Sequence, residues 1–198
     1  LIFGLYHVPH NDVERRILNA KSMGITHFDT AQLYGNERIC GEICNETDII
    51  TTKIYAANTA GQVDKLVKRS LRRFMNTANN TSIDCMLLHR PMPHECWGAL
   101  SKYTDNFKRL GISNYDINSL ESLLEYCETM NLKKPDVHQI EVHPFVDCDP
   151  LIAYCKNQGI TVQGHTILAQ GKFLNCQLLV NMATKYSTTP AAILTAWA

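Results

Sequence analysis

Four polar residues stand where short apolar segments of the chain end. Asp29, Lys53 and His89 each close or directly follow such a segment, and Tyr34 lies shortly after Asp29. A buried carboxylate keeps a neighbouring lysine charged, and a nearby ammonium favours the phenolate form of a tyrosine, which lowers its pKa. Such a tyrosine can donate a proton near neutral pH, and a histidine beside it can orient a carbonyl oxygen. This set predicts carbonyl reduction, with hydride supplied by a cofactor because no side chain can give it.

Each of these residues also has an ordinary structural explanation. A tyrosine after a strand is commonly a surface aromatic, a lysine is commonly solvated, and a histidine beside a proline turn is commonly a loop residue. Their recurrence at successive strand ends is what favours a shared site.

The elements that would position these residues alternate between strand and helix. Apolar runs predict strands, and 3.6-residue spacing predicts helices between them. We expect Asp12 and Thr189 to cap two of the helices. The expected strands are Ile2–Leu5, Thr26–Asp29, Asp48–Lys53, Ile83–Leu88, Phe107–Ile112, Asp136–Val142 and Ile160–Gln163. The expected helices are Asp12–Met23, Glu37–Asn45, Gly61–Met75, His94–Tyr103, Ile117–Met130, Pro150–Gln158, Gln177–Tyr186 and Ala191–Trp197.

Seven strand-helix units indicate a parallel sheet covered by helices, either a doubly wound sheet or a (β/α) barrel. Polar residues at nearly all the carboxyl ends of the strands favour the barrel, whose active site lies on that face. No G-x-G-x-x-G follows the first strand, which weakens the nucleotide-binding doubly wound alternative. We therefore predict an α/β fold of the (β/α)8 TIM-barrel type, incomplete with about seven units, as a single domain over residues 1–198.

Composition narrows the function further. The 19 Lys and Arg balance 19 Asp and Glu, so nothing points to nucleic acid or to an anionic membrane surface. The chain has no apolar run long enough to span a membrane, and Leu1–Leu5 lacks the basic flank of a signal peptide. The eight cysteines include no C-x-x-C pair, which favours free thiols in the core of a cytoplasmic protein.

Five separated segments, taken together, resemble the successive signatures of the aldo-keto reductases. Their order and spacing are family-like, and the resemblance runs from about Gly4 to Trp197. The segments are Phe28–Glu37, Thr52–Ile54, Leu87–Pro91, Leu110–Tyr115 and Gln139–Phe145.

This resemblance implies NADPH-dependent reduction of an aldehyde or ketone to an alcohol, with NADH left open as the donor. It makes Tyr34 the general acid, Lys53 the partner that lowers its pKa, Asp29 the partner of Lys53, and His89 the group that orients the carbonyl. It implies no metal ligand. The implied cofactor-binding residues are Asp29, Ser113, Asn114, Gln139, His165, Leu168, Gln170 and Gly171.

Three residues depart from the family pattern. His165 stands where a tyrosine usually stacks on the nicotinamide, and an imidazole offers less stacking area. Tyr6 falls where a pocket tryptophan is common. Arg90 follows His89 where tryptophan is frequent, and it places a cation either at the pocket mouth or on the rim; we favour the rim because arginine side chains usually carry their charge to water.

Length is the largest departure. A complete barrel has about 250 residues, and this sequence ends at Ala198, inside the helix that follows the seventh strand. The family's eighth unit normally grips the adenosine 2′-phosphate. Without that unit, strands one and seven would expose their edges, and an oligomer could cover them.

Two alternatives to the reductase remain open at this point. One is a catalytically weak or inactive relative that acts as a binding or regulatory protein. The other is a metal-dependent hydrolase using Asp29, His89 and His143, which is weaker because the chain has no closely spaced histidine pair. The carbonyl substrate is not identified by these residues.

Overall fold

The computed structural model describes residues 1–75 and 81–198. Their contacts divide the chain into two compact units, Leu1–Val137 and His138–Ala198. The expectation of a single domain over residues 1–198 stays a prediction.

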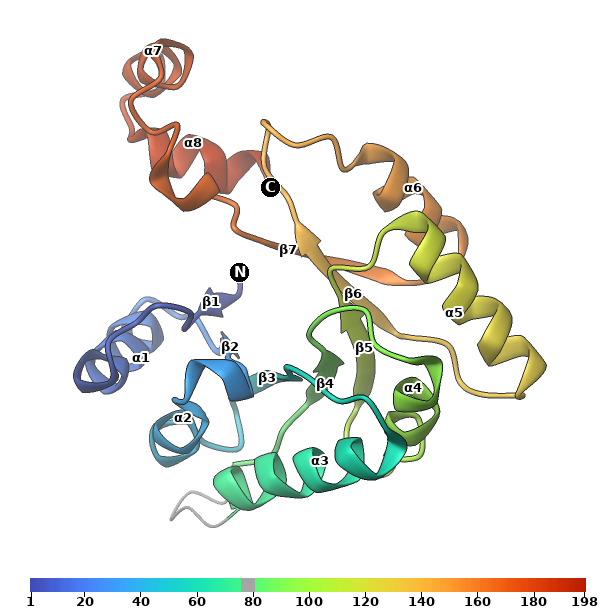
Figure 1. Cartoon of the computed structure of the whole chain (residues 1–198). Coiled ribbons are helices and arrows are strands. Elements are labelled where there is room, and N and C mark those ends of the chain that lie inside the picture. The colour runs from blue at the N-terminus through green and yellow to red at the C-terminus, as the bar shows by residue number, and fades with distance from the viewer. Residues whose placement is uncertain (76–80) are drawn as a thin grey trace. The chain divides into compact units, whose positions relative to one another are not determined.

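The first unit is built on five parallel strands that follow one another in chain order. Figure 1 shows its helices along the outer side of these strands. The strands are β1 (Phe3–Gly4), β2 (His27–Asp29), β3 (Ile49–Ile54), β4 (Cys85–Leu88) and β5 (Arg109–Ser113). The helical segments are η1 (His10–Asp12), α1 (Val13–Ser22), η2 (Gln32–Tyr34), α2 (Glu37–Ile43), α3 (Ala60–Met75), α4 (His94–Leu100) and α5 (Ile117–Thr129).

Burial explains why these segments form strands and helices. Every residue of β4 is buried, as expected for a parallel strand covered on both faces. The buried residues of α3 recur at helical spacing, at Val63, Val67, Ser70 and Phe74, so this helix packs one face inward.

The second unit begins inside β6 (Val137–Glu141) and contains β7 (Thr161–His165). A small apolar cluster around Ile140, Val142 and Cys148 holds it together, with Leu151, Ile152 and Val162 packed against it. Its remaining elements are α6 (Asp149–Asn157), η3 (Ala169–Gly171), α7 (Gln177–Lys185) and α8 (Pro190–Trp197).

All seven expected strands and all eight expected α-helices form, with ends that differ by a few residues. Thr189 caps α8 as predicted, because its hydroxyl accepts a hydrogen bond from the Ala192 N–H at 3.2 Å. The prediction for Asp12 is wrong, because the residue stands at the N-cap position of α1 without making a capping hydrogen bond. Its side chain caps nothing and instead accepts hydrogen bonds from Arg15, 2.9 Å from Nη2.

The cysteines are free thiols, and seven of the eight are buried. Cys176 is the one partly exposed thiol. Among residues 1–75 and 81–198, no helix combines the length and the apolar character needed to cross a membrane.

Gly111 on β5 marks a close approach between neighbouring backbones. A Cβ placed there would lie 2.3 Å from the Val137 carbonyl oxygen and 2.7 Å from a Leu87 methyl group. Since backbone cannot move aside as a flexible side chain can, only glycine fits at this point of the sheet.

We predict that Gly111→Ala lowers the free energy of unfolding by about 3 kcal/mol or more, because the added methyl group overpacks a site with no space. Urea unfolding followed by far-UV circular dichroism measures the change. Gly61→Ala is the matched control, since a Cβ at Gly61 in α3 would meet nothing within 4 Å. Equal stability of the two variants would contradict the close approach at Gly111.

Candidate active site

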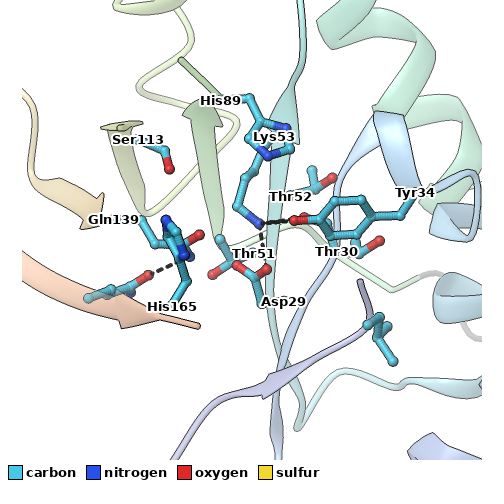
Figure 2. A network of polar contacts seen from close by, with 12 residues as sticks. Asp29, Thr30, Tyr34, Thr51, Thr52, Lys53, His89, Ser113, Gln139 and His165 are labelled. Carbon is cyan, nitrogen blue, oxygen red and sulfur yellow. Dashed lines mark hydrogen bonds and ion pairs between the residues drawn. The ribbon is translucent and has the colours of Figure 1, made fainter. Parts of the chain in front are cut away.

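The centre of the candidate site is the ammonium group of Lys53. It donates hydrogen bonds to Asp29 Oδ1, to the Thr30 carbonyl oxygen at 3.0 Å and to the Tyr34 hydroxyl at 3.3 Å. The Lys53 side chain is only 1% exposed. Figure 2 shows the ammonium pointing at both the carboxylate and the phenol. A buried cation with these partners is a candidate proton-transfer centre.

Strand pairing brings these groups together. Asp29 is the last residue of β2 and pairs with Thr51 of β3, two residues before Lys53 on the same strand. The Thr30 N–H then donates to the Thr51 carbonyl oxygen at 2.8 Å and extends the pairing by one bond. Because residues two apart on a strand share a face, the register places Lys53 above Asp29.

Tyr34 is held by the turn that follows β2. It ends η2, and Gly35 leaves the turn with a φ of 73°, a conformation that glycine adopts without a steric penalty. Asn36 anchors the turn from within, since its amide oxygen accepts from the Thr30 hydroxyl and its amide nitrogen donates to the Leu5 carbonyl oxygen at 3.0 Å. The phenol therefore projects from a well-anchored turn.

A buried carboxylate supports the start of α2 directly after this turn. Glu37 accepts hydrogen bonds of 2.7 Å from the Thr52 hydroxyl, the Ser70 hydroxyl and Arg73 Nη1. These contacts tie α2 to β3 and α3 at the position beside Lys53. Buried charges require such partners, so the cluster also fixes the backbone near the site.

The electrostatics of Tyr34 differ from the sequence expectation. Burial raises its pKa above the usual value of a tyrosine, and the negative charge of Asp29 and the nearby Tyr6 raise it further. The expected lowering of the Tyr34 pKa is therefore wrong for this structure, where desolvation by burial is the largest cause of the shift. Tyr34 is a protonated phenol at neutral pH.

His89 follows β4 and lies between two tyrosine rings. Its ring centroid is 5.7 Å from that of Tyr34 and 5.6 Å from that of Tyr55, both in edge-on geometry. The backbone N–H of His89 donates to the Ile54 carbonyl oxygen at 2.9 Å, which continues the pairing of β3 and β4. The imidazole is therefore on the same side as the phenol.

Two further aromatic contacts lie beside Tyr34 and His89. The centroid of the Tyr6 ring lies 4.9 Å from that of the Tyr34 ring, and its place in a pocket wall stays a prediction. The Arg90 guanidinium lies 4.9 Å from the centroid of the Tyr55 ring, so this exposed side chain rests on an aromatic face next to His89.

Sequence reasoning missed Tyr55. The signal was available, because Tyr55 lies two residues after Lys53 at the exit of β3 and extended residues two apart face the same side.

Ser113 and Asn114 lie at the end of β5 in the same unit. Ser113 is buried, and Asn114 adopts a left-handed φ of 61°. The Asn114 amide donates to the His89 carbonyl oxygen at 3.0 Å and to the Ser113 hydroxyl at 3.1 Å. The structure thus brings together six of the expected residues: Asp29, Tyr34, Lys53, His89, Ser113 and Asn114.

The remaining expected residues belong to the second unit. Gln139 on β6 is buried, and its amide nitrogen lies 3.4 Å from the Gln163 amide oxygen. His165 ends β7, is partly exposed, and has its Nδ1 2.8 Å from the Thr166 hydroxyl. The Gln139 amide and the His165 imidazole are thus each held by a neighbour within the second unit.

The segment after β7 has an unusual backbone. Ala169, Gln170 and Gly171 have φ angles of 48°, 56° and 79°, three consecutive residues in the left-handed region. Leu168 precedes them and its carbonyl oxygen accepts from the Gly171 N–H at 2.8 Å. Non-glycine residues in this conformation carry a cost of order 1–3 kcal/mol each and concentrate at ligand-binding segments.

The described residues contain no group of three or more His, Cys, Asp and Glu side chains that could hold a metal ion. His143, named for the hydrolase alternative, instead has its Nε2 3.0 Å from a carboxylate oxygen of Glu141.

Comparisons with known proteins agree with this geometry. The profile of the aldo/keto reductase family matches residues 1–198. An uncharacterised oxidoreductase of Schizosaccharomyces pombe is 30% identical, covering 98% of this chain and 72% of its own length. The methylglyoxal reductase DkgB of Escherichia coli O157:H7 is 29% identical, with 98% and 76% covered.

Solved structures show the same relationship. An aldo/keto reductase from Brucella melitensis superimposes with a TM-score of 0.85 at 26% identity, covering 99% of this chain and 78% of the other. A Gox0644 variant in complex with NADPH superimposes with a TM-score of 0.88 at 25% identity, covering 99% and 73%.

The chain belongs to the aldo/keto reductase family. It is an NAD(P)H-dependent oxidoreductase with a fold of the (β/α)8-barrel type, of which the described residues form seven strands. The predicted family and fold class are confirmed.

We predict that Asp29→Asn destabilises the fold by about 3–5 kcal/mol, because it leaves the buried ammonium of Lys53 without its counter-charge. Adding Lys53→Met to that variant removes the stranded charge and recovers part of the loss. Urea unfolding of both single variants and the double variant gives the coupling energy. Additive effects would show that the two charges do not stabilise each other.

Proposed function

We propose that this protein reduces an aldehyde or ketone to an alcohol, with Tyr34 as the proton donor. The observation that supports this most directly is the buried Lys53 ammonium, bound to both the Tyr34 hydroxyl and the Asp29 carboxylate. A phenol beside a fixed cation is suited to giving up its proton in the transition state, since the cation stabilises the phenolate that forms.

The residues present fit a nicotinamide cofactor. In the first unit, the hydroxyl of Ser113 and the carboxamide of Asn114 offer donors and acceptors of the kind that a nicotinamide carboxamide requires, and in the second unit Gln139 carries a carboxamide as well. The left-handed backbone after Leu168, through Gln170 and Gly171, suits a segment that runs along a pyrophosphate. When bound, the reduced cofactor supplies hydride to the carbonyl carbon. We propose NADPH as that cofactor, supported by the similarity to a structure that contains it.

The side chains of the first unit supply the rest of the reaction. His89 orients the carbonyl oxygen toward Tyr34, and the Tyr34 O–H transfers its proton to that oxygen as the carbonyl carbon is reduced. The new C–H and O–H bonds complete the alcohol, and the proton lost by Tyr34 is regained from water. Asp29 gives the Lys53 ammonium its counter-charge. In the second unit, the ring of His165 offers a surface for stacking.

We predict that Tyr34→Phe lowers kcat by about 10²–10⁴-fold, the range that a positioned general acid supplies. Reduction of 4-nitrobenzaldehyde, followed by the loss of nicotinamide absorbance, measures the rate. Tyr186→Phe is the matched control, since it changes an exposed tyrosine at the end of α7 and should leave kcat unchanged. NADPH titration against tryptophan fluorescence should give the same affinity for Tyr34→Phe as for the parent. A parallel loss of affinity would reject the assigned role.

A second prediction concerns pH. The donor must be protonated, so the rate falls as the pH rises through the Tyr34 pKa. Burial and the Asp29 charge hold that pKa above the usual value of a tyrosine, about 10, so kcat of the parent should not fall between about pH 7 and about pH 10. The Asp29→Asn/Lys53→Met double variant, which buries no unpaired charge, should turn over at least about tenfold more slowly, because no ammonium stabilises the phenolate that forms in the transition state. The pH profile of kcat in both proteins tests this, and a fall in the parent's kcat centred well below about pH 10 would contradict the assignment.

A further inference from the structure

Arg90 is a cation placed directly beside the proposed carbonyl-orienting residue. It follows His89 in the chain, so the two Cα atoms are about 3.8 Å apart across a trans peptide bond. An arginine at a rim commonly extends into water. Here the guanidinium instead rests 4.9 Å from the centroid of the Tyr55 ring.

The Tyr55 ring connects this cation to the reaction centre. One contact of the ring is the Arg90 guanidinium, and another is the edge-on imidazole of His89, 5.6 Å away between centroids. His89 in turn contacts the Tyr34 ring. Tyr55 is therefore a positioning residue that holds the guanidinium on the same aromatic wall as the phenol and the imidazole.

The charges on this wall do not balance. The Lys53 cation is matched by the Asp29 carboxylate. No ion pair among the described residues involves Arg90. The exposed charge of Arg90 beside His89 is thus not matched by a carboxylate among these residues.

We propose that Arg90 binds a carboxylate on the substrate, so that the site prefers aldehydes and ketones that carry an acid group over neutral ones of the same shape. This inference rests on the proposed function and names its substrate class. A guanidinium presents a planar fork of N–H donors that matches a carboxylate with two parallel hydrogen bonds. The carbonyl oxygen faces Tyr34 and His89, and the carboxylate lies at the other end of the substrate, toward Arg90.

The direct test compares two para-substituted aldehydes of nearly equal size. 4-Carboxybenzaldehyde carries a charge, and 4-carbamoylbenzaldehyde is its neutral counterpart. We expect kcat/KM to favour the charged aldehyde in the parent, and Arg90→Gln to lower that ratio by about 5- to 10-fold. Arg90→Lys should lower it less, because it keeps the charge and loses the fork.

Two controls separate this effect from a general loss of positive charge. Arg16→Gln removes a guanidinium from α1, and it should leave the ratio unchanged. Tyr55→Leu keeps Arg90 but removes its aromatic support, and it should lower the ratio. The parent's ratio should also fall as NaCl rises from about 0.05 to about 0.5 M, because this partly exposed ion pair is screened.

An equilibrium measurement gives a readout that does not depend on turnover. Saturation-transfer NMR with 4-carboxybenzyl alcohol should show binding to the parent and weaker binding to Arg90→Gln. If the parent reduces both aldehydes with equal kcat/KM, the inference is overturned while the proposed function stands. If neither aldehyde is reduced, the proposed function fails, and equal binding of the alcohol to the parent and Arg90→Gln would overturn the inference as well.

Discussion

The burial of one ammonium group constrains much of the first unit. Lys53 has three N–H donors, and each of them has an acceptor: a carboxylate, a backbone carbonyl oxygen and a phenol. A buried cation with a missing partner would cost several kcal/mol, so the acceptors must be held in place. The pairing of β2 with β3 supplies the first two acceptors, and the anchored turn that ends at Gly35 supplies the third. The arrangement suited to proton transfer is thus also the arrangement that satisfies the buried charge.

A second buried charge stiffens the same region. Glu37 begins α2 immediately after the turn and has partners on β3 and α3, including Arg73. Because Thr52 binds Glu37 and the next residue is Lys53, β3 links the two charged clusters through adjacent positions. A small displacement of α2 would therefore disturb the Tyr34 turn on one side and the strand carrying Lys53 on the other. Such coupled polar networks favour a single arrangement of the backbone.

Much of this was predictable from the sequence, and the reasons differ from residue to residue. The strands were predictable because apolar runs such as Cys85–Leu88 are buried on both faces, and the positions of Asp29 and Lys53 followed from the strand ends. The direction of the Tyr34 pKa shift was not predictable, because it depends on how completely the ring is removed from water, and the spacing of residues in a sequence does not reveal this. The three partners of Glu37 were equally hidden, since they come from β3 and α3, at least fifteen residues away along the chain.

The raised pKa of Tyr34 changes how the proposed chemistry must work. A phenol whose proton is held tightly in the resting site is a poor acid until negative charge develops on the carbonyl oxygen beside it. Desolvation then helps, because the same low-dielectric surroundings that resist the phenolate also strengthen its attraction to the Lys53 ammonium. The negative charge of Asp29 opposes the phenolate and raises the Tyr34 pKa, but it is also the counter-charge of the buried ammonium, so the same carboxylate that stabilises the cation makes the phenol a weaker acid. Arg90 differs from Lys53, because no ion pair among the described residues joins it to a carboxylate. Its charge is therefore available to a substrate.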